Sequence, residues 1–354
     1  MKIVIVLPFV SSHFIGGYRV HYEYANRLAL KGHSVTVAHM QYINIYKLRP
    51  LMGMIKSIIF GVNGKISWFS FNKYVKTTIL PNNFFLPGCD VLLLTHWYTA
   101  EVFGTRHDKA RLISQIAYDY ELWMAADTQK KARMEKAFLK SDILFSTSKV
   151  VSTMLLTSGR KPDAVIHCGY DSSIFCVTND PGNRKNVIGI LLREHTTKRV
   201  TDAILALESI WEPNKFRVIA GGKYTGSLPN WIEKFDISTD EKLSNFYNTM
   251  SIFILPSEYE GWGLPAVEAL ACGVAVISTR NGGVEDFLEH GINSILVTPK
   301  TPGEIALAVN TLLENESFRK DIIAKGLDTV KKMDWETPTT LLEQILLEKI
   351  QALQ

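Results

Sequence analysis

The sequence predicts an α/β protein built from two doubly wound halves, each a parallel sheet covered by helices on both faces. Short apolar segments alternate with helical stretches along the 354 residues, and this alternation is typical of parallel sheets. The polar segment 171–184, DSSIFCVTNDPGNR, contains a Pro-Gly turn and interrupts the alternation in mid-chain, as a linker does. The pattern restarts at residue 187, and a chain of this length fits two domains. We therefore expect domains at residues 1–170 and 171–337, with a cleft between them.

The first half opens as a β-α-β unit. An apolar strand is expected at residues 2–7, a helix at 18–31 and a second strand at 34–38. Gly16 and Gly17 end the loop after the first strand, where open α/β sheets bind ligands. The pair lacks the full G-x-G-x-x-G pattern, so it is a weak dinucleotide signal, and two glycines equally suit a tight turn. Further strands are expected at 91–95, 112–117 and 143–147, and helices at 127–140 and 149–157.

The second half repeats the alternation. Its first strand, at 187–192, is followed by a loop that carries Arg193, Lys198 and Arg199. Ser238 or Thr239 is expected to cap a helix, because each precedes a helical stretch and has a side chain that accepts from backbone N–H groups. The remaining elements are a helix to about 207, strands at 216–220, 251–255, 274–278 and 294–297, a helix at 241–249 and a last helix from about 338.

The composition is that of an ordinary globular protein, with 46% apolar and 21% charged residues. Residues 1–7 are too short for the apolar core of a signal peptide, and no uncharged apolar run reaches the length of a membrane span. The cysteines show no C-x-x-C spacing: they are Cys89, Cys168, Cys176 and Cys272. We expect a reduced, cytoplasmic protein without structural zinc.

The net charge of +4 hides an asymmetry between the halves. Residues 1–170 have a charge balance of +11 and the remainder has −7, which suggests that the first half faces an anionic partner. Segment 44–80 mixes lysines with bulky apolar residues and contains no acid, as suits a surface lying on an anionic membrane. The alternative is one or two ordinary helices that pack on the sheet with solvated lysines. Nucleic acid is a poorer explanation, because no nucleic-acid module is visible.

Residues 257–273, SEYEGWGLPAVEALACG, carry the most informative motif. An apolar strand precedes them, and a helix is expected to start with Pro265 at its first position. Gly263 lets a ligand approach the backbone, and a helix start can hold a phosphate. Glu268 falls one turn into the helix, where its carboxylate can accept hydrogen bonds from vicinal hydroxyls. Together these features describe a nucleoside-diphosphate site, although a β-α loop with solvated Glu260 and Glu268 explains the same residues.

Two blocks of the chain resemble the glycosyltransferases of family 4. Residues 16–37, GGYRVHYEYANRLALKGHSVTV, are similar to the N-terminal signature of that family. Residues 244–297 match its E-x7-E pattern and the flanks of that pattern. The resemblance implies the GT-B architecture, with two Rossmann-like domains and a C-terminal helix, about 338–354, that returns to the N-terminal domain. It also implies a nucleotide-sugar donor and retention of anomeric configuration.

The resemblance also implies roles for the residues of the E-x7-E motif. Glu268 matches the second glutamate, which holds the ribose hydroxyls, and Glu260 matches the first, near the transferred sugar. Gly263 and Leu264 match the positions whose backbone N–H groups meet the distal phosphate. Gly261, between the two glutamates, joins them as a donor-binding candidate.

Arg193 and Lys198 match the basic pair that neutralises the departing diphosphate in the family. Their charges suit that task, because an Arg and a Lys stabilise a leaving group that becomes anionic. The alternative is two exposed cations in a loop. Arg199 stands where the family pattern has a glycine. Gly16 and Gly17 match the loop that closes over the diphosphate from the first domain.

The acceptor side departs from the family pattern. Many members have a histidine near the sugar, but the corresponding stretch 115–123, QIAYDYELW, has none and looks closer to a rhamnosyltransferase-like subgroup. Asp119 and Glu121 are therefore candidates for binding acceptor or sugar hydroxyls. His96 is another candidate, although a lone histidine at a strand end is more often structural. The chain has no D-x-D motif, in agreement with metal-independent transfer and no cofactor.

The sequence thus predicts a retaining, metal-independent transferase that moves a hexosyl or deoxyhexosyl group from a nucleotide sugar, such as a UDP or dTDP sugar. The basic, apolar segment 44–80 suggests a glycan or lipid-linked acceptor in cell-surface polysaccharide or glycolipid assembly, at the inner face of the membrane. Two other classes stay open. One is a sugar-nucleotide epimerase or hydrolase of the same architecture, and the other is a non-catalytic protein that binds nucleotide sugars.

Overall fold

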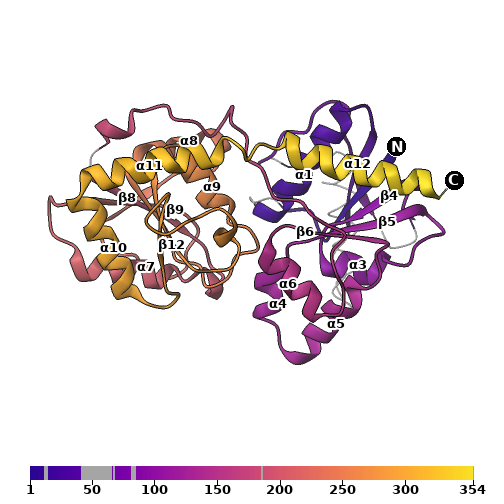
Figure 1. Cartoon of the computed structure of the whole chain (residues 1–354), viewed down its shortest axis with the longest axis horizontal. Coiled ribbons are helices and arrows are strands. Elements are labelled where there is room, and N and C mark those ends of the chain that lie inside the picture. Colours follow the sequence, from indigo (N-terminus) through magenta and orange to yellow (C-terminus); the bar gives the residue numbers. More distant parts are fainter. Residues whose placement is uncertain (12–14, 41–65, 67, 81–84, 185, 354) are drawn as a thin grey trace. The chain divides into compact units, whose positions relative to one another are not determined.

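The computed structural model of the chain describes residues 1–11, 15–40, 66, 68–80, 85–184 and 186–353 (Figure 1). It consists of two compact units. The first comprises Met1–Cys168 with Trp335–Gln354, and the second comprises Gly169–Asp334. Each unit is an α/β layer structure with its own sheet, and we describe each by itself.

The described part of the first unit contains a parallel sheet of seven strands in the order β3-β2-β1-β4-β5-β6-β7. The central strand β1 pairs with β2 through Ile3 and Val35, and with β4 through Ile3 and Val91. Because these strands are apolar and buried on both faces, helices must cover both. The strands are β1 (Lys2–Leu7), β2 (Ser34–Met40), β3 (Lys76–Leu80), β4 (Cys89–Leu94), β5 (Ala110–Ala117), β6 (Ile143–Ser146) and β7 (Ala164–Val165).

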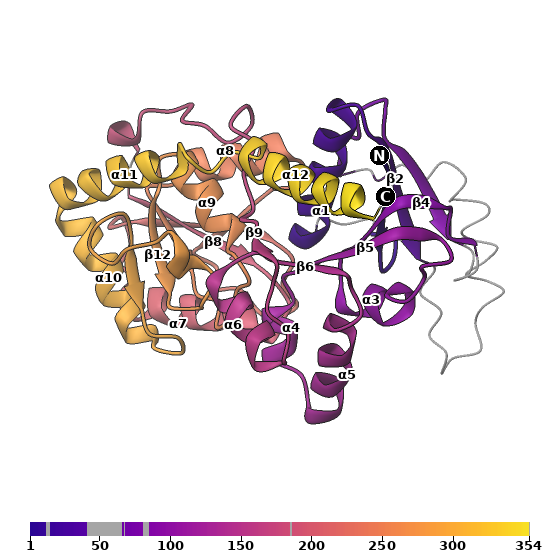
Figure 2. The same cartoon turned by 45° about the vertical axis from the view of Figure 1, so that its right-hand side comes forward.

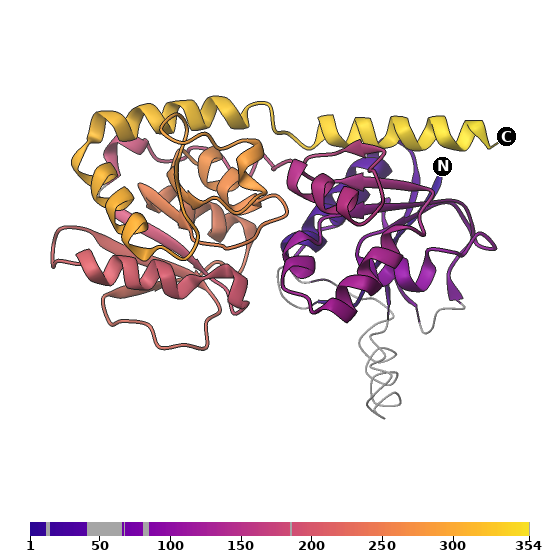
Figure 3. The ribbon, with the colours of Figure 1, turned by 60° about the horizontal axis from the view of Figure 1, so that its bottom comes forward.

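One face of this sheet packs on α3 (Trp97–Phe103), α5 (Thr128–Phe138) and α6 (Lys149–Thr157) through a shared apolar core. The short helix α4 (Tyr120–Met124) contacts α5 and α6. The opposite face carries α1 (Gly16–Leu30) and α12 (Glu336–Ala352), which lie against each other in all three ribbon views (Figures 1, 2 and 3).

The C-terminal helix α12 packs with the N-terminal unit, as predicted. Its apolar stripe of Leu342, Leu346 and Ile350 is buried. At the end of α1, the His33 Nε2 atom lies 2.8 Å from Glu343 Oε1, and Lys31 lies 2.7 Å from Glu336. These contacts tie the last helix of the chain to the first.

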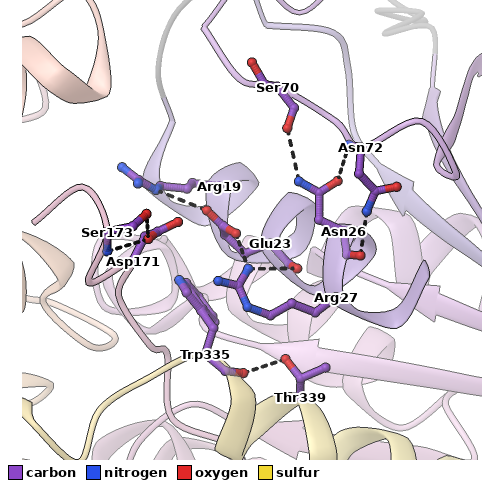
Figure 4. Close-up of polar contacts among 10 residues, drawn as sticks. All are labelled: Arg19, Glu23, Asn26, Arg27, Ser70, Asn72, Asp171, Ser173, Trp335 and Thr339. Atoms are coloured by element: carbon purple, nitrogen blue, oxygen red, sulfur yellow. Dashed lines mark hydrogen bonds and ion pairs between the residues drawn. The ribbon is translucent and has the colours of Figure 1, made fainter. Parts of the chain in front are cut away.

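A row of alternating charges runs along α1 (Figure 4). Arg19 Nε lies 3.9 Å from Glu23 Oε1, and Arg27 pairs with the same carboxylate one turn later. The Arg27 guanidinium also lies 5.7 Å from the centre of the Trp335 ring, which packs edge-on against Tyr24. The buried Trp335 ring therefore anchors the chain on α1 just before α12 begins.

Segment 44–80 is described only in part, because residues 41–65 and 67 lie outside the described residues. Trp68, Phe69 and Phe71 pack around Tyr22 of α1, with ring centres 5.5, 5.1 and 4.8 Å away. Asn26 of α1 donates to the Ser70 carbonyl oxygen at 3.1 Å (Figure 4). These aromatic side chains thus belong to the packed structure of the unit. The described part of the segment forms turns and strand β3, not the helices of the alternative interpretation, and membrane contact stays a prediction. No helix in the described part of the chain is long and apolar enough to cross a membrane.

The described part of the second unit contains a parallel sheet of six strands in the order β10-β9-β8-β11-β12-β13. Strand β11 pairs with β8 through Ile252 and Ile188, and with β12 through Ile252 and Ala275. The predicted class of two parallel, doubly wound sheets is confirmed. The strands are β8 (Val187–Leu192), β9 (Arg217–Gly222), β10 (Ile232–Phe235), β11 (Ile252–Leu255), β12 (Ala275–Thr279) and β13 (Ile295–Val297).

Helices also surround the second sheet. The helices α7 (Val200–Ile210) and α10 (Pro302–Glu314) share one apolar core against it. The helices α8 (Asp240–Thr249), α9 (Leu264–Ala271) and α11 (Glu316–Val330) also flank it, and α9 contacts both α8 and α11. This arrangement leaves the carboxyl ends of β8, β11 and β12 at one edge, where their loops meet.

Candidate functional site

Three loops of the second unit come together at the carboxyl edge of its sheet. The loop after β8 contains the short 3-10 helix Thr196–Lys198, and the loop after β11 runs to Gly263. The Glu258 N–H donates to the Thr197 carbonyl oxygen at 2.7 Å, and the Glu260 N–H donates to the Asn281 carbonyl oxygen at 3.1 Å. These backbone bonds fix the loops after β8, β11 and β12 to one another at the edge where open α/β sheets bind ligands.

The paired loops bring Arg193, Lys198 and Glu260 together. Lys198 Nζ lies 2.9 Å from Glu260 Oε1, and Arg193 Nη1 lies 3.9 Å from the same oxygen. Burial of Glu260 by itself would raise the pKa of that carboxyl, but the two cations outweigh it and hold the pKa below its usual value. One carboxylate between two cations leaves the cluster with positive charge, which suits an anionic ligand.

Arg199 has a left-handed backbone, with φ 49° and ψ 34°. This conformation costs a non-glycine residue about 1 kcal/mol, which explains why a glycine suits this position. Here the guanidinium donates to both carboxylate oxygens of Asp202, at 2.8 and 2.9 Å. The bidentate pair offsets the backbone cost and fixes the loop next to Lys198.

The helix α9 begins at Leu264, with Gly263 before it in a left-handed conformation at φ 102°. A residue with a Cβ atom would be strained at this φ and would approach Val284 to 2.6 Å. Pro265 occupies the second helical position instead of the predicted first one. The first N–H groups of a helix have no partner within it, so this turn can receive a phosphate group.

Glu268 lies one turn into α9 and is buried. The Tyr247 hydroxyl, from α8, donates to Glu268 Oε2 at 3.1 Å. Burial raises the pKa of Tyr247 well above its ordinary value, the nearby Glu268 acts in the same direction, and Arg193 opposes both. The charges of both Arg193 and Glu268 therefore act on the Tyr247 hydroxyl.

This arrangement has the parts that a nucleoside diphosphate requires. Two cations and a helix start can receive the diphosphate, and a carboxylate one turn later can accept from ribose hydroxyls. The described residues contain no group of three His, Cys, Asp or Glu side chains that could hold a metal ion.

Gly16 and Gly17 belong to the first unit, where they are the first two residues of α1. The sequence places them at the end of a loop, so the helix begins two residues earlier than expected. A Cβ atom on Gly17 would lie 2.6 Å from the Tyr118 ring, and that ring packs 5.3 Å from the ring of His21. Gly17 is therefore required for the close approach of Tyr118 to α1.

His96 and Asp119 also lie in the first unit, and the structure brings them together. His96 caps α3, and its Nδ1 atom accepts from the Tyr98 N–H at 3.1 Å. Its Nε2 atom lies 3.7 Å from Asp119 Oδ1. The other Asp119 oxygen accepts from the Trp97 N–H at 3.2 Å, and Glu121 is half-buried at the start of α4. His96 thus has a structural role as a helix cap.

Asp119 is fully buried, and Asp119 Oδ1 has no hydrogen-bond partner among the described residues. Burial raises the pKa of Asp119 to about 8. The folded protein therefore holds this proton more tightly than the unfolded chain, so the stability that Asp119 contributes falls as the pH rises from about 4 to about 8.

We expect Asp119→Asn to remove this pH dependence. Between pH 5 and pH 8 the wild-type protein should lose stability relative to the variant by at least about 1 kcal/mol, since each unit of pKa shift is worth about 1.4 kcal/mol. Melting temperatures of both proteins at the two pH values measure the effect. An equal change for both proteins would contradict the protonated state of Asp119.

Tyr247, Asp202 and the glycine pair of the β12 loop, Gly282 and Gly283, were not among the predicted site residues. Tyr247 lies 21 positions before Glu268, and no local spacing links residues that far apart on different helices. The Asn281-Gly282-Gly283 run was visible and could have indicated a close backbone approach. Gly283 indeed faces the backbone of Glu260–Trp262 at a distance that a Cβ atom could not occupy.

Comparison with known proteins gives one family match. Residues 178–328, most of the second unit, match the family of glycosyl transferases group 1. The chain is 27% identical over 208 residues to an uncharacterized glycosyltransferase of Methanocaldococcus jannaschii, covering 56% of this chain and 58% of that protein. The alignment thus spans little more than half of that relative. The O-antigen chain mannosyltransferase B of Escherichia coli is 25% identical over 283 residues, which cover 73% of this chain and 71% of the relative.

Two solved structures cover nearly the whole chain. The sucrose-phosphate synthase of Thermosynechococcus elongatus has a TM-score of 0.79 at 16% identity, with 99% of this chain and 100% of that one covered. The Anabaena protein Alr3699/HepE, in complex with UDP and glucose, has a TM-score of 0.76 at 17% identity, with 98% and 100% covered. At this identity the likeness shows the fold, and the predicted GT-B fold is confirmed.

Proposed function

We propose that this chain is a retaining glycosyltransferase that moves a sugar from a nucleoside-diphosphate sugar to a hydroxyl group of a glycan or lipid-linked acceptor. The observation that carries the proposal is the cluster of the half-buried Arg193 with the buried Lys198 and Glu260, in the same unit as the Gly263 turn and Glu268. The match of residues 178–328 to group 1 glycosyl transferases supports it.

In the proposed reaction the bond between the anomeric carbon and the diphosphate oxygen breaks, and the acceptor oxygen bonds to the anomeric carbon on the face that the diphosphate leaves. A phosphate oxygen of the donor takes the acceptor proton. Arg193 and Lys198 stabilise the charge that develops on the diphosphate, and Glu268 holds the ribose. The protein positions the reactants and stabilises charge, without a protein nucleophile or a metal ion.

Separate observations favour particular classes of donor and acceptor. The complex of HepE with UDP favours a UDP sugar, and a dTDP sugar is the second candidate. The similarity to an O-antigen chain mannosyltransferase and the basic segment 44–80 favour a step in cell-surface polysaccharide or glycolipid assembly at the inner face of the membrane. The segment 115–123 favours a rhamnosyltransferase-like subgroup.

A donor screen tests the proposal. Thermal-shift measurements with UDP, GDP, ADP and dTDP and their common sugars identify the donor. Product analysis by NMR with candidate acceptors then gives the anomeric configuration. A new glycosidic bond with retained configuration supports the proposal. Release of a free or epimerised sugar without an acceptor favours an epimerase or hydrolase, and binding without turnover favours a non-catalytic protein.

Glu268→Ala should weaken donor binding about 10-fold or more, because hydrogen bonds to a charged group are worth about 1.5–3 kcal/mol. Calorimetric titration with the donor that the screen identifies measures the loss. Glu208→Ala, an exposed glutamate on α7, is the matched control and should bind the donor as wild type does. Unchanged affinity and turnover in Glu268→Ala would show that the donor site is wrongly assigned.

A further inference from the structure

Tyr247 is held rigidly inside the second unit. Its side chain is fully buried, and its ring meets Phe253 edge-on at 5.5 Å between ring centres and 87° between planes. The ring of Phe175 lies 6.1 Å away. A ring packed on two sides by aromatic neighbours has one orientation, so the position of its hydroxyl group is fixed by the core.

The Tyr247 hydroxyl contacts a carboxylate on a different helix. It donates to Glu268 Oε2 at 3.1 Å, from α8 to α9. Since burial keeps the pKa of Tyr247 well above its ordinary value, the hydroxyl stays protonated and remains a donor. Glutamate has three rotatable side-chain bonds, and a fixed donor on one oxygen restricts them.

A second contact keeps α8 and α9 at a constant spacing. The buried Arg184 guanidinium donates to Asn248 Oδ1 at 3.0 Å and to the Cys272 carbonyl oxygen at 2.8 Å. Asn248 follows Tyr247 in α8, and Cys272 caps the end of α9. Arg184 therefore joins the two helices next to Tyr247 and at the end of the helix that carries Glu268.

We infer that Tyr247 is a positioning residue for ribose recognition: its fixed hydroxyl directs the Glu268 carboxylate toward the ribose hydroxyls of the donor, and Arg184 with Asn248 maintains the helix spacing on which this depends. The inference rests on the proposed function, in which Glu268 holds the ribose. The preference of the site for a ribose over a deoxyribose then depends on a buried tyrosine of the neighbouring helix.

The test uses Tyr247→Phe, which removes the hydroxyl and keeps the ring. Calorimetric titrations measure binding of UDP, GDP and ADP, each beside its 2′-deoxy counterpart. Wild type should prefer the ribonucleotide in at least one pair. In Tyr247→Phe the affinity for that ribonucleotide should fall about 10-fold, the affinity for the deoxynucleotide should change less, and the preference should shrink toward that of Glu268→Gln. Tyr74→Phe, which removes an exposed hydroxyl in the first unit, should retain the wild-type preference.

A double variant separates positioning from a loss of folding. In the Glu268→Gln background, Tyr247→Phe should not reduce the preference further, whereas a general destabilisation would reduce it in both backgrounds. If wild type binds none of these nucleoside diphosphates and does not bind dTDP, the proposed function fails. If wild type binds dTDP alone, or binds the pairs without preferring a ribonucleotide, the role of Tyr247 is overturned while the proposed function stands. If wild type prefers the ribonucleotide and folded Tyr247→Phe keeps the full preference, the role of Tyr247 is overturned while the proposed function stands.

Discussion

Lys198→Met should lower kcat by about two to three orders of magnitude, the range found when one preorganised charge-stabilising group is removed from an active site. Lys198 Nζ lies 2.9 Å from Glu260 Oε1 in a buried pair, so the lysine is held in place before the donor binds. Because its charge opposes the charge that develops on the departing diphosphate, the loss should fall on kcat more than on donor affinity.

The same substitution should also destabilise the second unit, by about 3–5 kcal/mol, because it leaves a buried carboxylate without its nearer cation. The double variant Lys198→Met with Glu260→Gln removes both charges and should recover stability without recovering turnover. Steady-state kinetics and thermal melting measure the two effects separately.

Lys320→Met is the matched control for Lys198→Met, since Lys320 forms an exposed ion pair with Glu316 on α11. It should leave turnover and melting temperature near their wild-type values, because exposed pairs are worth about 0–1 kcal/mol. Wild-type turnover in Lys198→Met would exclude this lysine from the reaction.

The parallel sheets and the E-x7-E region could be predicted because their signals are local. Strands such as Val187–Leu192 and Ile252–Leu255 are continuous apolar runs, as fully buried parallel strands require. The turn before α9 has Gly263 and Pro265 at a helix start, and its φ of 102° explains why a glycine stands there. The places of the Glu260 and Glu268 carboxylates could then be predicted, because Glu260 lies on the loop before this turn and Glu268 lies one turn into the helix.

Two edge strands with mixed sequences were missed, whereas the wholly apolar edge strand Ile295–Val297 was predicted. Lys76–Leu80 and Ile232–Phe235 each contain charged residues and lie at the ends of their sheets, where alternation is short and weak. The start of α1 was misplaced for a different reason. Gly16 and Gly17 have low helix propensity, but both lie in the helix, and residue 17 is a glycine because Tyr118 occupies the space of a side chain.

The contacts that orient the site could not be predicted, because they join residues distant in the sequence. Nothing near Glu268 indicates Tyr247, and nothing near Asn248 indicates Arg184. The left-handed Arg199 was missed for a different reason, since its partner Asp202 is only three positions away. Its conformation departs from what its residue type prefers, and the compensation by Asp202 becomes visible only when the loop has folded.

Gly283→Ala should disable the site through packing alone. The backbone of Gly283 is at φ −70° and ψ −40°, which alanine adopts without strain. A Cβ atom there, however, would lie 2.5 Å from the Trp262 nitrogen and 2.7 Å from the Glu260 carbonyl oxygen. Both are backbone atoms and cannot rotate away, so the loop that carries Glu260 must shift.

A shift of this loop should lower kcat/KM about 100-fold, the effect expected when reacting groups are misplaced by about 1 Å. Overpacking should also reduce the free energy of unfolding by about 1–3 kcal/mol.

The matched control is Gly303→Ala in α10, where an added Cβ atom meets nothing within 4 Å. Alanine in place of an exposed helical glycine should preserve turnover and raise stability by up to about 1 kcal/mol. The two variants should therefore change the melting temperature in opposite directions, and steady-state kinetics should show a loss of activity in Gly283→Ala alone. Wild-type activity in Gly283→Ala would mean that the position of Glu260 does not limit turnover.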